Sequence, residues 1–168
     1  MVKLKGVQIA FFDLDGVLSI PRFRDNLGNI KCAIGSDDGA WFDKANWNSD
    51  CYKDCKVNPN IIALLNKLKS KNVRLYVLTH DTNSGSYFNK VDFVLNNYKE
   101  YFDSYRQVLF VSKTNNKVRL MDIYCAKYGI SHKDCLLVED TFDTCIEAND
   151  KGFRVCHISE LFLTDGEI

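Results

Sequence analysis

The chain has 168 residues, of which 46% are hydrophobic and 26% charged, as is typical of a soluble globular domain. Lysine plus arginine number 22, and so do aspartate plus glutamate, so no overall charge favours nucleic acid, and any such partner would need a local basic patch. No segment offers the roughly 18 uninterrupted apolar residues of a membrane span, and MVKLKGVQIAFFD lacks the pattern of a signal peptide. We therefore expect a cytoplasmic protein that does not enter a membrane.

Strands and helices are expected to alternate along the chain. The first strand is the apolar run VQIAFFD at 7–13, and a polar stretch with poor periodicity follows at about 16–57. Further strands are expected at 73–79, 107–112, 135–140 and 153–158, with helices at 58–70, 84–102, 117–128 and from the fourth strand to Gly152. Asn58 and Pro59 form a helix start, and Gly129 is a suitable helix end.

Each strand is a continuous apolar run, which indicates a parallel sheet with helices on both faces. We expect an α/β fold, a three-layer α/β/α doubly wound sheet of about five strands in the Rossmann-like manner, as a single domain over 1–168. The segment at about 16–57 would be a small flap or cap insert in this domain.

Three of these strands end in polar side chains, namely Asp13, Thr79 and the pair Glu139–Asp140. In a doubly wound sheet the carboxyl ends of the strands meet at one crevice, where ligands bind. Each residue alone is explained by capping of the next helix. Together with a lysine at the start of a later helix they predict an active site.

The segment Asp13-Leu14-Asp15-Gly16-Val17-Leu18 resembles the first signature of the haloacid dehalogenase (HAD)-like hydrolase superfamily. LYVLT, which ends at Thr79, is similar to the second signature, and VEDTFDTCIEANDKG is similar to the fourth. The third signature is a lysine. The helix start NKVRLMD favours Lys117, and Lys113 is the alternative.

This resemblance implies a magnesium-dependent phosphatase that acts through an aspartyl-phosphate. Asp13 would be the nucleophile, and Asp15 the general acid and base. Mg²⁺ would be held by Asp13, Asp140 and the main-chain carbonyl of Asp15, with Glu139 orienting the site. In the superfamily, an aspartate at the position of Asp15 goes with phosphatases and phosphomutases rather than dehalogenases.

Substrate binding would fall to Thr79, Lys117 and His80. The resemblance implies that Thr79 and Lys117 hold the phosphoryl oxygens. His80, the residue after Thr79, either contacts substrate or caps the following turn.

The insert at 16–57 is too short for a full helical cap, which places the chain in a phosphatase branch with a minimal cap and disfavours a phosphomutase. The substrate would be phosphorylated but of unknown class, and an oligomeric neighbour is an alternative means of closing the site. Trp41, Phe42 and Trp47 either form a small core under the insert or, with nearby basic residues, stack a nucleic-acid base. A nucleic-acid 3′-phosphatase or nucleotide phosphatase is therefore one alternative, and a binding or scaffold protein without turnover is another.

Seven cysteines are present. Cys125, Cys135, Cys145 and Cys156 fall in apolar stretches and are expected to behave as small buried hydrophobes. Cys32, Cys51 and Cys55 fall in the polar insert, where they are a candidate zinc site that lacks an evident fourth ligand.

Overall fold

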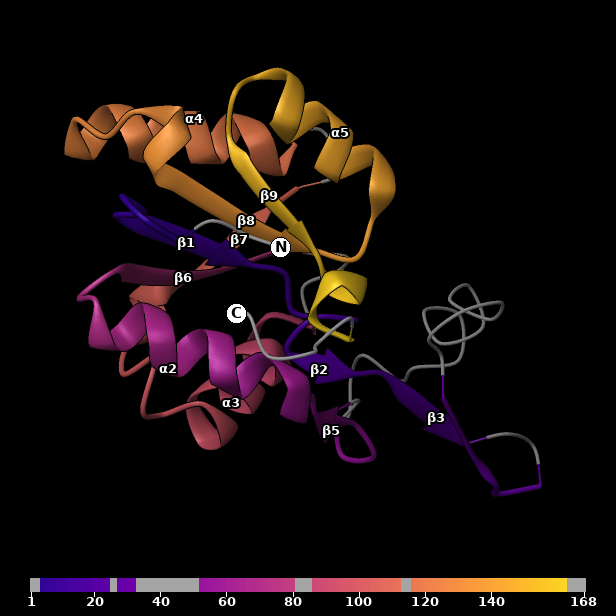
Figure 1. The fold of residues 1–168 in the computed structure, drawn as a ribbon. Helices are drawn as coiled ribbons and strands as arrows, with labels where there is room; N and C mark the ends of the chain where they lie inside the picture. Colours follow the sequence, from indigo (N-terminus) through magenta and orange to yellow (C-terminus); the bar gives the residue numbers. More distant parts are fainter. Residues whose placement is uncertain (1–3, 25–26, 33–51, 81–85, 113–115, 163–168) are drawn as a thin grey trace.

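The computed structural model describes residues 4–24, 27–32, 52–80, 86–112 and 116–162 of the chain (Figure 1). Its centre is a five-stranded parallel sheet with the strand order β7-β6-β1-β8-β9. The strands are β1 (Ile9–Phe12), β6 (Arg74–His80), β7 (Val108–Val111), β8 (Cys135–Glu139) and β9 (Arg154–His157). In the described ranges, no helix is both long and apolar enough to cross a bilayer.

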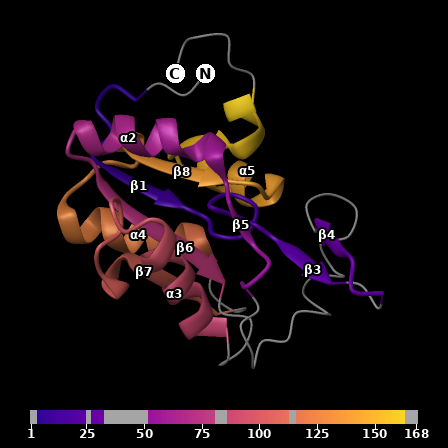
Figure 2. The same ribbon diagram turned by 90° about the horizontal axis from the view of Figure 1, so that it is seen from below.

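The first strand, β1, occupies the middle of the sheet, between β6 and β8 (Figure 2). The chain builds outward from β1 through β6 to β7, and then crosses to the other side of β1 to add β8 and β9. The strand order therefore reverses beside β1. In open parallel sheets, such a reversal leaves a crevice at the carboxyl ends of the strands.

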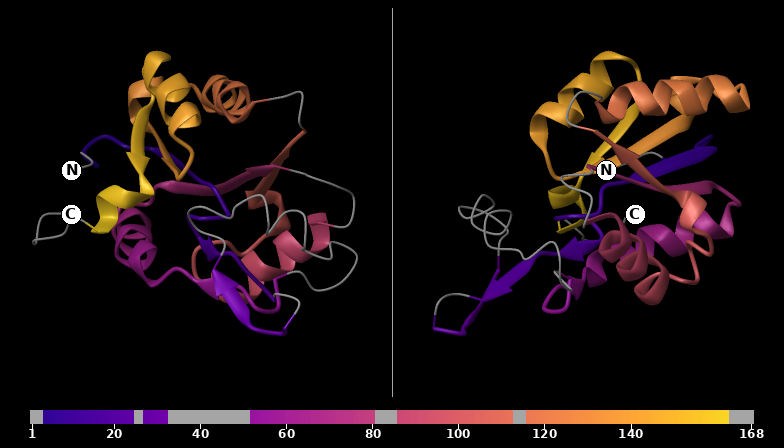
Figure 3. Two further views of the ribbon diagram at one scale, coloured as in Figure 1. Left: turned by 90° about the vertical axis from the view of Figure 1, so that its right-hand side faces the viewer. Right: turned by 180° about the vertical axis from the view of Figure 1, so that it is seen from behind.

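Helices cover both faces of the sheet. Among the described residues, the α-helices are α2 (Ile62–Ser70), α3 (Ser86–Asn97), α4 (Lys117–Tyr128) and α5 (Phe142–Asp150). Figure 3 shows α4 and α5 on one face, and α2 and α3 on the other. The expected α/β/α sandwich is thus confirmed.

Alternate residues of β1 pack into two separate cores because successive side chains of a strand point to opposite faces. Ala10 and Phe12 belong to the core that includes the apolar residues of α2 and α3. Ile9 and Phe11 belong to the core that includes those of α4 and α5. All four side chains are fully buried, which explains why the strand is an uninterrupted apolar run.

The expected helix boundaries hold with one correction. Asn58 caps a short 3₁₀ turn, η1 (Pro59–Ile61), which leads into α2, and Gly129 ends α4 in the left-handed conformation. However, α3 ends at Asn97 rather than near residue 102. The chain turns there because the amides of Tyr101 and Phe102 both bond to the carbonyl of Tyr98. Three further 3₁₀ turns complete the described chain, namely η2 (Tyr105–Gln107), η3 (His132–Asp134) and η4 (Ile158–Phe162).

The described parts of the 16–57 insert form two small antiparallel sheets, whereas no regular element was expected there. One pairs β2 (Ser19–Ile20) with β5 (Lys56–Val57), and the other pairs β3 (Arg22–Arg24) with β4 (Ile30–Cys32). Strands of two or three residues are too short to show periodicity. In Figure 1, β3 extends away from the five-stranded sheet.

Several sequence hypotheses about the insert fall on residues outside the described ranges. These are Trp41, Phe42, Trp47 and Cys51. Of the other two cysteines, Cys32 is exposed and Cys55 is buried in the core. Burial raises the pKa of the Cys55 thiol to about 11, so this cysteine behaves as a small core residue.

Candidate active site

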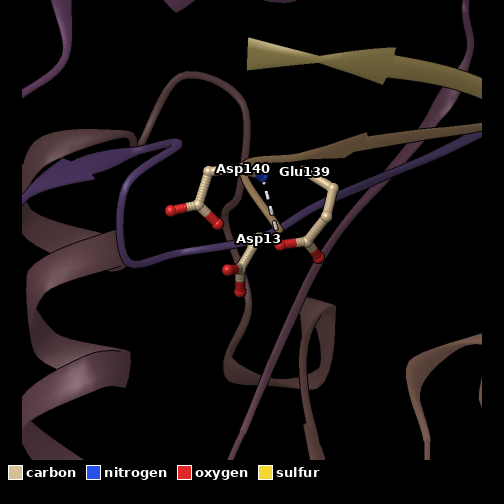
Figure 4. A group of neighbouring side chains, drawn as sticks. All are labelled: Asp13, Glu139 and Asp140. Carbon is tan, nitrogen blue, oxygen red and sulfur yellow. Dashed lines mark hydrogen bonds between the residues drawn. The ribbon is translucent and has the colours of Figure 1, made fainter. Parts of the chain in front are cut away.

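Three carboxylates meet at the carboxyl ends of β1 and β8, beside the reversal of strand order (Figure 4). Asp13 directly follows β1, Glu139 is the last residue of β8, and Asp140 comes next. Each offers an oxygen, and these oxygens lie within 4.8 Å of one another. The parallel pairing of β1 with β8 brings these residues together although they are far apart in the sequence.

Lys117 reaches this cluster from the first residue of α4. Its Nζ lies 2.8 Å from Oδ1 of Asp13 and 2.7 Å from Oε2 of Glu139, and its side chain is 4% exposed. Asn116 fixes the start of the helix, since its side chain accepts a hydrogen bond from the amide of Arg119. Lys113, the alternative from the sequence, lies outside the described residues.

Burial and crowding control protonation in the cluster. Burial, with the negative charge of Glu139, raises the pKa of Asp13 to about 7 against the pull of Lys117. Burial and the charge of Asp13 raise the pKa of Asp140 to about 8. Burial opposes ionisation of Glu139 too, but Lys117 and hydrogen bonds hold its pKa below the usual value. One ammonium is therefore insufficient for two buried carboxylates and a third that is half-buried.

This shortage of positive charge fits a divalent cation. Mg²⁺ prefers oxygen ligands and usually takes one or two carboxylates, retaining several waters. Glu139 is poorly placed to be one of them, because Oε2 accepts from Lys117 and Oε1 accepts from the amides of Asp140 and Thr141. Asp13 and Asp140 are therefore the carboxylates of this cluster that could take a cation.

Gly16 leaves the space that Asp140 occupies. Its φ is +92°, and a Cβ built there would lie 1.9 Å from Oδ2 of Asp140. Any other residue at this position would therefore collide with the Asp140 carboxylate and also adopt a strained backbone. The glycine is required by the close approach of the β1 loop to this carboxylate.

A second group of polar side chains surrounds Asp15. The Tyr52 hydroxyl donates to Oδ1 of Asp15 at 2.7 Å, and Lys90 Nζ lies 3.0 Å from Oδ2. The same ammonium donates to Oγ1 of Thr79 at 2.9 Å and to the carbonyl of His80 at 2.8 Å. Lys90 comes from the middle of α3, and Tyr52 from the end of the insert.

The sequence alone yields no relatives: no family model matches the chain, and no curated protein is similar to it. Solved structures are similar in fold. A haloacid dehalogenase-like family hydrolase from Streptococcus pneumoniae superposes with a TM-score of 0.57 at 16% identity, over 89% of this chain and 83% of that one. A HAD family enzyme from Bacteroides thetaiotaomicron, solved as a magnesium complex, gives 0.51 at 15% identity, over 95% and 100%. The fold is that of the haloacid dehalogenase-like hydrolases.

Two other neighbours are longer than this chain. A phosphatase domain of a Bacteroides fragilis protein, complexed with Mg, has a TM-score of 0.53 at 12% identity, and the match spans 90% of this chain but 36% of that one. A hypothetical protein from Xanthomonas campestris gives 0.50 at 15% identity, over 90% and 64%. The chain therefore spans less than two thirds of the length of either protein.

Within this HAD-like fold, every residue that the sequence analysis singled out for catalysis lies at one end of the sheet. Asp13, Asp140 and Lys117 form one group, and Asp15 and Thr79 form the other. His80 is the last residue of β6 and lies at the surface. Partial burial, and then the positive charges of Lys117 and Lys90, lower the pKa of its imidazole.

Neither Lys90 nor the contact of Tyr52 with Asp15 was predicted from the sequence. One signal for Lys90 was present, since it lies three residues after Tyr87 and four before Val94, on the apolar side of the helix. A lysine at such a position has to find a buried partner. Tyr52 carries no comparable signal, because the insert around it has no regular pattern.

Proposed function

We propose that this chain is a magnesium-dependent phosphomonoester hydrolase that acts through an aspartyl-phosphate on Asp13. The observation that carries the proposal is the Asp13 carboxylate, which Lys117 holds at 2.8 Å beside Glu139 and Asp140. A carboxylate fixed by a buried ammonium is a suitable nucleophile for phosphorus. The structural neighbours include a phosphatase domain, which supports the same chemistry.

In the first half of the reaction, an oxygen of Asp13 attacks phosphorus, and the bond between phosphorus and the leaving oxygen breaks. Asp15 gives its proton to that oxygen, so that an alcohol departs. In the second half, water attacks phosphorus and Asp15 takes a proton from it. The bond from Asp13 to phosphorus breaks, which releases inorganic phosphate and restores both carboxyl groups.

The phosphoryl oxygens need donors and positive charge during both halves. Among the described residues, Lys117 has two carboxylate partners, so one of its three N–H groups remains for the phosphoryl group. The Thr79 hydroxyl and the His80 imidazole lie at the end of β6 as further candidates. Lys117 also reduces the repulsion between the carboxylates and an anionic substrate.

Asp13, Asp140 and the main-chain carbonyl of Asp15 would hold Mg²⁺. When bound, the ion would neutralise negative charge on the transferring group and on the two carboxylates. The raised pKa values of Asp13 and Asp140 support this assignment, because buried carboxylates repel each other until a cation joins them. Two structural neighbours were solved with magnesium.

The test is hydrolysis of a panel of phosphorylated sugars, nucleotides, peptides and oligonucleotide ends, with Mg²⁺ and with a chelator. We expect Mg²⁺-dependent release of phosphate, which Asp13→Asn reduces to background. Asp143→Asn is the matched control, because Asp143 is an exposed carboxylate in the first turn of α5. Acid quenching followed by mass spectrometry should find a phosphoryl group on the peptide that contains Asp13.

The main competing hypothesis is a binding or scaffold protein without turnover. It predicts that the parent protein releases no phosphate from any member of the panel, and that Asp13→Asn leaves its ligand binding unchanged. The assembled group of Asp13, Asp15, Thr79, Lys117 and Asp140 favours the hydrolase.

A further inference from the structure

Lys90 is a buried lysine at the site that the proposed reaction does not use. Its side chain is 1% exposed, and it comes from α3 rather than from the end of a strand. A charged group is rarely buried so completely unless its partners are fixed. The partners of Lys90 are therefore informative about its role.

The ammonium of Lys90 has three protons and three acceptors. The acceptors are Oγ1 of Thr79 at 2.9 Å, the carbonyl of His80 at 2.8 Å and Oδ2 of Asp15 at 3.0 Å. An ammonium donates three hydrogen bonds and accepts none. Lys90 consequently has no donor left for a phosphoryl oxygen, which distinguishes it from Lys117.

The contact with Thr79 fixes the direction of the hydroxyl. Because Oγ1 accepts from the ammonium, the hydroxyl proton has to point elsewhere. Among the described residues it has no other partner. The hydroxyl is thus left as a donor at the end of β6, as a phosphoryl oxygen requires.

The contact with Asp15 fixes a carboxylate. Lys90 approaches Oδ2, while the Tyr52 hydroxyl donates to Oδ1 at 2.7 Å. Two donors on the two oxygens define the rotation of the carboxylate plane. A general acid works only when its proton lies within hydrogen-bonding distance of the leaving oxygen.

We infer that Lys90 is a positioning residue for the proposed reaction, which orients the Asp15 carboxylate for proton transfer and the Thr79 hydroxyl for phosphoryl binding. The inference rests on the proposed function. It assigns different tasks to the two buried lysines: Lys117 serves the nucleophile and the phosphoryl group, and Lys90 serves the acid.

The leaving group separates this role from a structural one. A 4-nitrophenyl ester leaves without much help from a proton, whereas glycerol 2-phosphate needs one. We expect Lys90→Met to lower kcat for the glycerol ester by about 10²-fold, the usual contribution of a general acid, and to lower kcat for the nitrophenyl ester much less. Lys90→Arg should recover part of the loss. Lys99→Met is the control, because Lys99 is exposed beyond the end of α3.

An equal loss on both esters, or no loss on either, would overturn the inference. If Lys90→Met unfolds, Lys90→Gln provides a polar side chain of similar length for the same comparison of esters. In the Asp15→Asn background, Lys90→Met should no longer act selectively on glycerol 2-phosphate, because the proton-transfer step is already removed, and the loss that remains through Thr79 should be equal for the two esters. A loss as selective as in the parent background would contradict this coupling.

Binding of inorganic phosphate provides a readout without turnover. In calorimetry with Mg²⁺ present, we expect Lys90→Met and Thr79→Val each to weaken phosphate binding, and the double variant to bind no more weakly than Thr79→Val alone. Unchanged binding in Lys90→Met would overturn the role at Thr79. A parent that releases phosphate from neither ester nor any member of the panel would refute the proposed function, and the phosphate measurement would still decide the role of Lys90 at Thr79.

Discussion

Lys117 and Lys90 each bring a buried ammonium to one of the two carboxylates of the DLDG segment, but their surroundings differ. Lys117 lies among Asp13, Glu139 and Asp140, where negative charge exceeds positive charge and two carboxyl pKa values rise to about 7 and about 8. Lys90 has a single carboxylate, Asp15, and two neutral acceptors. The first group is short of positive charge and the second is balanced.

This difference indicates what each half of the site can do. The group that lacks positive charge can accept a cation and an electrophilic phosphorus atom, since both relieve its repulsion. The balanced group gains little from either, and it holds its members in fixed positions instead. The two halves share no side chain, so we expect substitutions in each half to have different effects.

Substitution of Lys117 should have the largest effect. Lys117→Met leaves Asp13 and Glu139 buried without their cation, and breaking a buried ion pair costs about 3–5 kcal/mol. It also removes a donor to the phosphoryl group, worth about 10²–10³-fold in kcat. We expect loss of both stability and activity, measured by chemical denaturation and steady-state kinetics.

Lys90→Met is the comparison for this prediction. The only charged partner of Lys90 among the described residues is Asp15, which has 12% of its side chain exposed, whereas Glu139 beside Lys117 has none exposed. We therefore expect a smaller loss of stability than in Lys117→Met. Equal losses of stability in the two variants would mean that the two halves do not differ as described.

The sequence predicted the residues at the strand ends, which belong to both halves of the site. Asp13 and Asp140 follow β1 and β8, Thr79 lies near the end of β6, and in a parallel sheet the strand ends must converge. Lys117 was predicted from the start of its helix. The apolar pattern of the strands and the convergence of parallel strand ends were therefore sufficient to predict the sheet and most of the residues around Asp13.

The contacts of Lys90 and Tyr52 with Asp15 depend on tertiary packing, which no local sequence pattern predicts. Lys90 contacts Asp15 only because α3 lies against β6, and Tyr52 does so only because the end of the insert returns beside its beginning, where β5 pairs with β2. These contacts join segments that are far apart in sequence.

Gly16→Ala should have the next largest effect, confined to the charge-deficient half. The added methyl would lie 1.9 Å from Oδ2 of Asp140, so this carboxylate has to move. We expect Mg²⁺ affinity to fall by about 10-fold or more, by analogy with loss of a group that orients a metal ligand, as measured by calorimetry.

Gly152→Ala is the matched control for Gly16→Ala. Its φ is +83°, close to that of Gly16, but a Cβ there meets nothing within 4 Å. Both variants should lose about 1 kcal/mol of stability through the strained backbone, while Gly152→Ala binds Mg²⁺ like the parent. A similar loss of Mg²⁺ affinity in both would refute the crowding at Asp140.

The pH dependence of stability tests the repulsion among the carboxylates. The pKa of Asp13 rises from 3.8 to about 7 on folding, so the folded state holds this proton more tightly than the unfolded state. This tighter proton binding stabilises the folded state fully below about pH 4, and the stabilisation is lost as the pH rises through 7. Without metal, Asp13→Asn should therefore become more stable than the parent as the pH rises from about 5 to about 8.

Thermal unfolding of both proteins in a chelator measures this difference. The lowered pKa of His80 acts in the opposite direction, but it is present in both proteins, so the difference between them reports Asp13 together with its repulsion of Asp140. Excess Mg²⁺ should stabilise the parent more than Asp13→Asn, and more at pH 8 than at pH 5, because the ligands have to be ionised. A difference that does not vary with pH would contradict the assignment.

The smallest effect is expected at Tyr52, in the balanced half. Tyr52→Phe keeps the ring beside Phe93, where the ring centroids lie 5.1 Å apart, and removes only the hydroxyl that donates to Asp15. We expect kcat for glycerol 2-phosphate to fall by about 3- to 10-fold, as for loss of one hydrogen bond to a carboxylate that Lys90 still holds. Tyr101→Phe removes a hydrogen bond of the same length, 2.7 Å to Asn66, away from the site and should leave kcat unchanged. If Tyr52→Phe lowered kcat as much as Lys90→Met, the tyrosine rather than the lysine would be the main support of Asp15, and the comparison of the two lysines would have to be revised.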